Sequence, residues 1–398
     1  MASEIRGRVR SAGAAALILA ATACAPAPSP SVVAGPTRDA VAPSETVTTP
    51  RPTLVDAGSI ETHLLDAGYV PGSALYSTGT QIVWSAGAPS SSEIWRYVPG
   101  SLQPERVYAS PRAESSITSV VGSAAGYAFV ELSKPSFGDG GWRVWFLSGP
   151  GTEPVQLAAG NARQAGHSPT IAMDDARIAW AGFDEPPGDI SFVLDHAVSR
   201  LAMASTSDPR SITTLLERPV REALLWYPCL NGNELWYGTI HGDLDLTGVG
   251  DEFHVEMLDL ANPTAPPVPF VGSGNDFNPA VNDAFVVWKT SEAGDSALNW
   301  GTLKVLDRRT QRVATIPTEP ANRPSIGDRY VAFDEIFHAR LEVYDLDAGG
   351  LLELAPPVGS ESNLSYGGEL VHGRLLTFFE QAPGGGQPRI GWAMLPGE

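Results

Sequence analysis

A segment of about fifty residues recurs seven times along this chain, and this repetition constrains the fold more than any other feature of the sequence. Each copy places two small or apolar residues before an aromatic one. The seven aromatic residues are Trp84, Phe129, Trp180, Tyr237, Trp288, Phe333 and Phe378. Successive members are 45, 51, 57, 51, 45 and 45 residues apart. Repeats of this length are typical of arrays whose units bury their apolar faces against one another.

Each copy contains the pattern of four short strands. A proline-led strand and a polar turn precede the aromatic residue in four clear copies, 168–180, 227–237, 278–288 and 323–333. An alternating strand follows, as in 255–260, 303–308 and 341–346, and period-two alternation indicates a strand with one buried face. A shorter strand ends the copy, as in 312–316. Four strands per repeat predict the blade of a β-propeller, with the aromatic ring packed between neighbouring blades.

The two ends of the repeat region predict how the ring closes. The last copy supplies three strands, near 369–371, 375–379 and 389–395. The segment 61–65 precedes the first full copy and has the pattern of a fourth strand without a blade. Pairing it with the C-terminal strands removes two exposed sheet edges at once. We therefore predict an all-β fold, a seven-bladed propeller of four-stranded blades closed by an N-terminal strand.

The repeat resembles that of TolB-like propellers of bacterial periplasmic proteins. The resemblance covers residues from about 70 to 395 and rests on the proline-led strand, the apolar pair with its aromatic residue, and an alternating strand ending in aspartate. That aspartate is present at Asp259, Asp307 and Asp345, whereas the Pro-Asp-Gly turn of the family is absent. The resemblance implies a propeller exported from the cytoplasm.

The N-terminus has the pattern of an export signal. Three arginines precede the apolar stretch 12–23, which is too short to span a bilayer roughly 30 Å thick. The stretch ends in Ala21-Thr22-Ala23-Cys24, which resembles the lipobox of bacterial lipoproteins, with Ala21 where that family usually has Leu or Val. The resemblance implies cleavage before Cys24 and acylation of that residue. The alternative is a secreted protein cut after Ala23, with Cys24 incidental.

The segment after Cys24 is rich in proline and cannot bury a core, so we expect an extended tether. We therefore divide the chain into a signal peptide (1–23), the acylated cysteine with a disordered tether (24–52), and the propeller (53–398). The expected location is the cell membrane, through the lipid anchor, on its extracytoplasmic side. With Cys24 acylated, Cys229 has no disulfide partner; it is expected to lie buried in a strand, the alternative being a reactive thiol.

The charge of the chain limits the classes of partner that it can bind. It has 26 basic and 45 acidic residues, a net charge of −19. Removing residues 1–23 leaves 23 basic and 44 acidic residues, a net charge of −21. So acidic a surface repels phosphate backbones, which excludes nucleic acid as a partner, and it permits divalent cations. We expect a monomer.

One acidic segment has the spacing of a calcium loop. Oxygen-bearing side chains stand at relative positions 1, 3, 5 and 9 of 243–252, with glycine at position 6, and belong to Asp243, Asp245, Thr247 and Asp251. Ca²⁺ takes six to eight oxygen ligands, and glycine permits the turn that brings them together. The segment resembles the calcium loops in the propeller of integrin α chains. The alternative is an acidic hairpin loop without a metal.

Two long acidic loops in neighbouring repeats are expected to open on one face and to form a binding edge. The residues expected there are Asp184, Glu185, Asp189, Asp195 and Glu252, with Trp300 of the fifth repeat as an exposed aromatic. Solvated loops without a ligand are the alternative. The histidines at 196, 241 and 254 lie nearby and could also suit a transition metal.

No catalytic motif occurs: the sequence lacks a G-x-S-x-G elbow, an HExxH helix, a P-loop and paired CxxC motifs. We therefore expect a non-enzymatic binding or scaffold module for a protein, peptide or glycan partner. The alternative is an envelope glycan hydrolase or lyase. A hydrolase of this kind needs two carboxylates roughly 5–10 Å apart in the central funnel.

Overall fold

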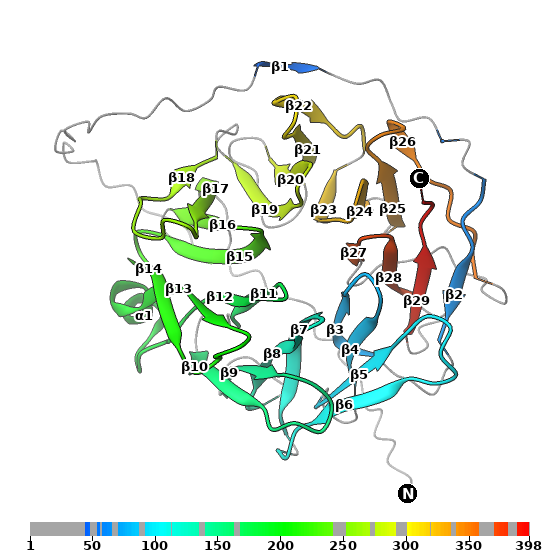
Figure 1. Cartoon of the computed structure of the whole chain (residues 1–398). Helices are drawn as coiled ribbons and strands as arrows, with labels where there is room; N and C mark the ends of the chain where they lie inside the picture. Colours follow the sequence, from blue (N-terminus) through cyan, green and yellow to red (C-terminus); the bar gives the residue numbers. More distant parts are fainter. Residues whose placement is uncertain are drawn as a thin grey trace, which may run out of the picture. The chain divides into compact units, whose positions relative to one another are not determined.

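The computed structural model describes residues 44–47, 54–55, 58–65, 71–86, 92–112, 114–134, 140–162, 168–241, 252–270, 275–291, 301–318, 320–335, 340–357, 370–380 and 388–397. The chain divides into two units, Met1–Ala40 and Val41–Glu398, and every described residue belongs to the second. That unit consists of seven antiparallel four-stranded sheets (Figure 1), one of which gains a fifth strand.

The first three blades follow one another along the chain. Blade 1 contains β3 (Pro71–Ser77), β4 (Ile82–Ala86), β5 (Glu93–Tyr97) and β6 (Glu105–Ala109). Blade 2 contains β7 (Ser116–Ser123), β8 (Gly126–Leu132), β9 (Gly140–Leu147) and β10 (Val155–Ala162). Blade 3 contains β11 (Thr170–Met173), β12 (Arg177–Phe183), β13 (Val198–Ser205) and β14 (Ile212–Pro219), with the short helix α1 (Ile190–His196) between β12 and β13.

Four more blades complete the ring. Blade 4 contains β15 (Leu224–Asn231), β16 (Glu234–His241), β17 (Glu252–Asp259) and β18 (Val268–Pro269). Blade 5 contains β19 (Asp276–Val281), β20 (Phe285–Thr290), β21 (Thr302–Asp307) and β22 (Arg312–Thr315). Blade 6 contains β23 (Ala321–Ile326), β24 (Tyr330–Glu335), β25 (Arg340–Asp345) and β26 (Gly350–Leu351). Blade 7 contains β27 (Leu370–His372), β28 (Leu375–Glu380), β29 (Arg389–Met394) and, from the start of the chain, β2 (Thr62–Leu64).

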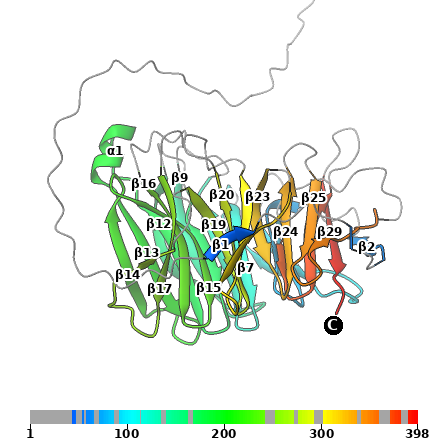
Figure 2. The ribbon, with the colours of Figure 1, turned by 90° about the horizontal axis from the view of Figure 1, so that it is seen from above.

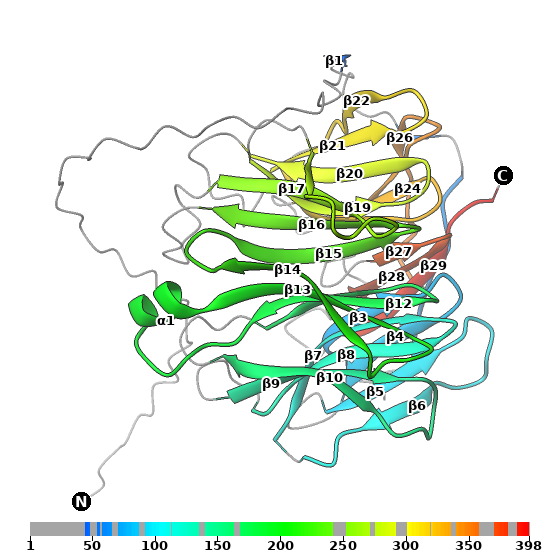
Figure 3. The same cartoon turned by 60° about the vertical axis from the view of Figure 1, so that its left-hand side comes forward.

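The first strand of each blade lies innermost. These seven strands contact one another in chain order, and β27 of the last blade returns to β3 of the first. Figure 3 shows the blades stacked side by side, each rotated against the next. The predicted all-β, seven-bladed propeller is therefore confirmed.

The repeat aromatic residues pack between blades, as predicted. All seven lie on the second strand of their blade and are at most 4% exposed. Each shares a hydrophobic cluster with the preceding blade: Phe333 of blade 6 packs with Val287 and Val305 of blade 5, and Trp84 packs with Leu375 and Ile390 of blade 7. One large buried side chain thus lies in the hydrophobic cluster at each junction.

The aspartate that ends the third strand of blades 4, 5 and 6 shapes the turn that follows it. The carboxylate of Asp259 accepts a hydrogen bond from the backbone N–H of Ala261 at 2.9 Å, and Asp307 accepts one from Arg309 at 2.8 Å. Asp345 accepts in the same way from Asp347 at 3.0 Å. An aspartate that bonds its own backbone two residues on stabilises a turn, so this part of the repeat is a turn signal.

The N-terminal strand closes the ring, as predicted. In β2, Thr62 pairs with Ala393 of β29 and Leu64 with Gly391, in antiparallel register. The backbone N–H of Leu65 then donates to the carbonyl of Ile390 at 2.9 Å. The last blade is therefore built from both ends of the repeat region.

The segment before β2 follows the outer edges of two other blades. The backbone N–H of Val55 donates to Leu351 of blade 6 at 2.9 Å, and that of Ile60 donates to Glu353 at 2.8 Å. Earlier still, β1 (Ser44–Val47) pairs in parallel with β22 of blade 5. This strand falls within the range 24–52 that the sequence predicts to be a tether, most of which lies outside the described residues. Within the described part, no helix is both long and apolar enough to cross a membrane.

Because the repeat aromatic residues pack between blades, removing one aromatic side chain should lower the stability of the protein strongly. Phe333→Ala should lower the free energy of unfolding by about 3–5 kcal/mol, because a fully buried aromatic side chain leaves a cavity that the two sheets cannot close. Urea denaturation followed by tryptophan fluorescence measures this cost. Leu102→Ala is the control, since Leu102 is fully exposed, and it should change stability by less than about 0.5 kcal/mol. Equal effects of the two substitutions would contradict the role given to Phe333.

The closure also predicts a backbone effect at Leu65. Leu65→Pro removes the N–H that bonds Ile390, whereas Leu65→Ala removes a similar amount of apolar side chain and keeps the N–H. The proline variant should therefore be less stable than the alanine variant by about 1–3 kcal/mol, the cost of an unsatisfied buried carbonyl. The same denaturation experiment tests this, and equal stabilities would mean that the ring does not depend on this bond.

Candidate functional site

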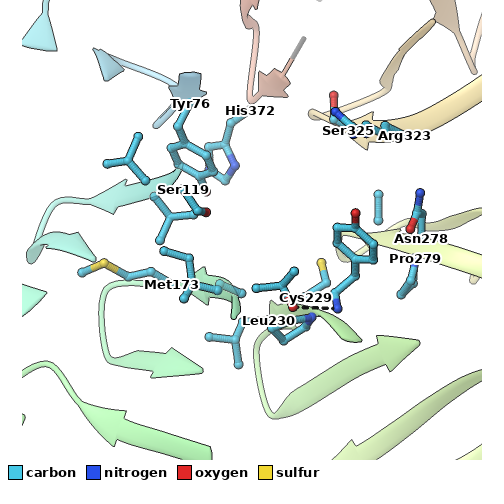
Figure 4. Close-up of a pocket in the computed structure, with 18 of the residues that line it drawn as sticks. Tyr76, Ser119, Met173, Cys229, Leu230, Asn278, Pro279, Arg323, Ser325 and His372 are labelled. Atoms are coloured by element: carbon cyan, nitrogen blue, oxygen red, sulfur yellow. Dashed lines mark hydrogen bonds between the residues drawn. The ribbon is translucent and has the colours of Figure 1, made fainter. Parts of the chain in front are cut away.

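The inner strands of the seven blades line a central cavity of about 660 Å³ (Figure 4). Pockets that hold small organic ligands usually measure roughly 300–1,000 Å³. The wall is largely apolar, with Ile171, Met173, Leu230 and Val281 among its residues. Among the described lining residues the ionisable ones are Tyr76, Tyr227, Cys229, Arg323 and His372.

Tyr227, Asn278 and Arg323 occupy equivalent positions on the inner strands of blades 4, 5 and 6. Each stands directly before the proline of its repeat. Each also has a positive φ, of 45°, 53° and 46° respectively. We call these three residues the pre-proline arc, and all three line the cavity.

A proline accompanies the departure from regular pairing in these three strands, although β7 of blade 2 also shifts register, at Ile117/Ser119, without one. Proline has no N–H for the ladder, and each of the three strands shifts register across it, at Trp226/Cys229, Phe277/Ala280 and Asn322/Ser325. Such bulges re-aim side chains and are frequent beside functional sites. A non-glycine residue in the left-handed region costs about 1–3 kcal/mol, so the arc holds strain at three successive blades. Retained strain of this kind indicates a function for the side chains that it positions.

Asn278 is the buried polar member of the arc. Its side chain is 8% exposed, and its Oδ1 accepts no hydrogen bond. A buried acceptor left without a donor costs about 1–3 kcal/mol, and such groups are few in native proteins. Asn278 lines the cavity, and its Oδ1 is a buried acceptor there without a donor.

Arg323 is the exposed, permanently charged member of the arc. Behind it, Lys289 of β20 is fully buried, and its Nζ donates to Asn322 Oδ1 at 2.9 Å. The backbone N–H of Arg323 donates to the same oxygen at 3.0 Å, so Asn322 links the two cationic residues. Burial, followed by the charge of Arg323, lowers the pKa of Lys289 to about 7. Arg323 thus places a permanent positive charge at the cavity wall, in a chain that is otherwise strongly acidic.

Aromatic side chains border the third member of the arc. The rings of Tyr227 and Trp226 stack 5.5 Å apart, and Phe277 meets both edge-on. The backbone N–H of Tyr227 donates to Thr170 Oγ1 of blade 3 at 2.9 Å, which ties the bulge to its neighbour. Burial raises the pKa of Tyr227, partly offset by the charge of Arg323, so its hydroxyl stays protonated near neutral pH. This side of the cavity offers an apolar surface beside the cation.

The arc lies toward the face of the disc that carries the connections between second and third strands. In blade 4 the start of β15 pairs with the end of β16, and His241 of β16 pairs with Glu252 of β17. The equivalent connection of blade 3 contains α1, which Figure 2 shows at one face of the blades. The two connections predicted to form a binding edge therefore leave the blades on one face, the face nearer the arc.

The predicted edge residues of blade 3 have structural contacts. Asp184 accepts from the backbone N–H of Asn161 at 2.7 Å, and Glu185 is 1% exposed. Asp189 caps α1 by accepting from Phe192 at 2.9 Å, and Asp195 pairs with Arg221 at 2.7 Å. In blade 4, Glu252 is exposed, with His254 3.6 Å away. Trp300 lies outside the described residues.

The predicted calcium ligands Asp243, Asp245, Thr247 and Asp251 all lie outside the described residues, as does Cys24. Within the described ranges, no group of three or more His, Cys, Asp or Glu residues could hold a metal. Two of the predicted histidines, 241 and 254, are neighbours, with ring centroids 5.2 Å apart. Cys229 lies on β15 at the cavity wall and is half-buried, not fully buried as expected. Burial raises the pKa of its thiol to about 11, which favours the unreactive, protonated form.

The lining offers no support for glycoside hydrolysis. None of the described residues around the cavity is Asp or Glu, whereas that chemistry needs a pair of carboxylates. The residues that do gather here were missed by the sequence analysis, although a signal existed. The signal is the first position of three aligned copies, directly before the proline, which is occupied by Tyr227, Asn278 and Arg323. The residue type changes at this position from copy to copy, whereas the apolar pattern that follows is kept.

No model of a known family matches the chain, and no curated protein is similar to it in sequence. Solved structures are similar in fold. An acylaminoacyl peptidase in complex with Z-Gly-Gly-Phe-chloromethyl ketone aligns with a TM-score of 0.55 at 12% identity, over 85% of this chain and 51% of that one. The acylaminoacyl peptidase of Pyrococcus horikoshii gives 0.51 at 12% identity, over 79% of this chain and 49% of that one.

The β-propeller domain of the trilobed protease from Pyrococcus furiosus aligns with a TM-score of 0.52 at 10% identity, over 81% of this chain and 95% of that one. That domain has an open velcro topology, whereas here β2 completes the last blade. This chain spans about half the length of the acylaminoacyl peptidases. At such identities the likeness is one of fold alone: the chain is a seven-bladed propeller module similar to the propeller domains of peptidases.

Proposed function

We propose that this protein is a lipid-anchored binding protein of the cell envelope that takes up its ligand in the central cavity of the propeller. The observation that carries the binding role is the pre-proline arc, three strained residues on successive inner strands with an unpartnered buried acceptor among them. Rigid strands that hold polar groups at the wall of an apolar cavity are typical of ligand sites. The partner is a protein segment, a peptide or a glycan, and no catalytic step is needed.

The envelope location rests on the sequence. The arginine-rich start, the short apolar stretch and Cys24 support export and acylation. The repeat supports a relationship to TolB-like periplasmic propellers. The spacing of Asp243, Asp245, Thr247 and Asp251 supports a Ca²⁺ ion in the long loop of blade 4, which would stiffen the face through which a ligand enters.

Substitution of Cys24 tests the anchor. In a bacterial host given radiolabelled palmitate, the wild-type protein should carry label and sediment with membranes, because several acyl chains together give stable attachment. Cys24→Ser should lose the label and appear in the soluble extracytoplasmic fraction. Cys229→Ser is the control and should stay labelled. An unlabelled wild type that is soluble after cleavage would indicate an ordinary secreted protein.

Filling the cavity tests the binding role. Ala172 lies at the cavity wall on β11, and Ala172→Trp should occupy part of the space that a ligand needs. Thermal melting is measured with peptide and glycan fractions prepared from an envelope digest. At least one fraction should raise the melting temperature of the wild type, since a ligand bound only by the native state stabilises it.

Two further variants make this result interpretable. The exposed substitution Ala261→Trp should respond like the wild type, whereas Ala172→Trp should not respond. Ser119→Trp fills the cavity from β7 instead, in case the first variant folds poorly. A response of equal size in every variant would place binding outside the cavity, and the absence of any response in the wild type would overturn the proposal.

A further inference from the structure

The chemistry of the pre-proline arc specifies its ligand more closely than the cavity does. Arg323 is the only lining residue within the described part that is charged at every physiological pH. Arg323 is an exposed residue of the cavity wall, and its charge acts to lower the pKa of both Lys289 and Tyr227. A guanidinium is a planar fork that matches the two oxygens of a carboxylate. One end of the ligand therefore carries an acid group.

Asn278 adds a second requirement. Its Oδ1 is an acceptor, so the ligand must offer a hydrogen-bond donor one blade away from the acid group. A simple fatty acid, which is ionised at neutral pH, offers no such donor. An acid with an amide N–H close to its carboxylate satisfies both residues at once. Asn278 lies on blade 5, between Tyr227 on blade 4 and Arg323 on blade 6. The hydrogen-bond donor of the ligand should therefore lie between its acid group and the aromatic wall.

The aromatic wall adds a third requirement. Trp226 and Tyr227 present stacked rings beside the arc, and apolar side chains continue the wall. A ligand with an apolar group next to its amide would bury that group there, at a gain of roughly 25 cal/mol per Å² of apolar surface. Acid, neighbouring amide N–H and neighbouring side chain are the three features of the last residue of a peptide.

We propose that the pre-proline arc binds the C-terminal residue of a peptide, with its carboxylate at Arg323, its amide N–H at Asn278 Oδ1 and an apolar side chain against Tyr227. This assignment rests on the proposed function, since it specifies the ligand of the same cavity. The left-handed backbone of the arc is then the strain that aims three side chains at one residue. Capture of a C-terminal carboxylate is one of the recurring modes of peptide recognition, here built from side chains of three blades.

Calorimetry with a matched pair of probes tests the proposal on the full-length chain. N-acetyl-Gly-Leu carries the carboxylate, the amide N–H and the apolar side chain, whereas N-acetyl-Gly-Leu-amide lacks only the charge. The acid should bind at least tenfold more tightly than the amide. N-acetyl-Gly-Asp, with a charged last side chain, should bind more weakly than the leucine probe. Equal affinities of acid and amide would overturn the role of Arg323.

Three variants assign the contacts. Arg323→Gln should lose at least tenfold in affinity for the acid and remove the preference over the amide. Asn278→Gly should lose a similar factor although glycine adopts the observed φ without strain, so its melting temperature should not fall. Gln311→Gly is the control: Gln311 also has a positive φ, of 56°, but lies in the turn before β22, and its affinity should equal that of the wild type.

A spectroscopic readout separates binding from folding. The chain has three lysines, at positions 134, 289 and 304, so ¹³C-lysine labelling gives few signals. The acid probe should shift the signal of Lys289, which neighbours Arg323, and leave those of the other two in place. Another outcome is that the acid and amide probes bind equally well, to the wild type and to both arc variants, but not to Ala172→Trp. That result would reject this assignment and keep the cavity as a binding site. Failure of both probes to bind the wild type would reject the assignment, while the envelope-fraction experiment decides the proposed function separately.

Discussion

The contact on which the rest of the structure depends is the one between a repeat aromatic residue and the blade before it. A four-stranded sheet alone leaves both faces open to water, so no blade can be stable by itself. Each repeat aromatic side chain, such as that of Trp288 or Phe333, is buried against the preceding sheet. The same contact recurs at all seven junctions. The propeller is therefore expected to fold and unfold as one unit. Its last junction, between blades 7 and 1, depends on Trp84. The number of aromatic residues at this repeat position thus equals the number of blades.

Closure gives the N-terminal segment a structural role in addition to its expected role as a tether. Val55 and Ile60 bond to the edge of blade 6, and residues 62–65 then complete blade 7, so this part of the chain covers the outer edges of two consecutive sheets. An uncovered edge strand is a template for pairing with another chain. If residues 24–52 lead to a lipid anchor as we propose, tension on the tether would act first on the contacts of β1 with blade 5 and of Val55 with blade 6, and then on the strand that closes the ring.

Much of the fold could be predicted from the sequence because the signals are local and repeated. The aromatic spacing gave the blade count, the unpaired segment 61–65 gave the closure, and the aspartates at 259, 307 and 345 marked turns that the structure explains. The candidate site could not be predicted in the same way. Hydrophobic periodicity does not show that the residue before a proline takes a left-handed conformation, and proximity across three blades depends on a register that only the assembled ring provides. The acidic loops have an unusual composition that favours a binding role, yet Asp189 caps a helix and Asp195 forms an ion pair.

The position of the arc follows from what a propeller can keep rigid. A bulge with a left-handed residue in an isolated hairpin would relax, since the strain of about 1–3 kcal/mol has little to oppose it. In this ring each inner strand is held by its own sheet and by the inner strands on both sides, and a bond such as that from Tyr227 N–H to Thr170 Oγ1 fixes one blade to the next. The inner wall can therefore retain this strain at three successive blades. The same junctions that determine the blade count thus also allow three strained residues to be held at the cavity wall.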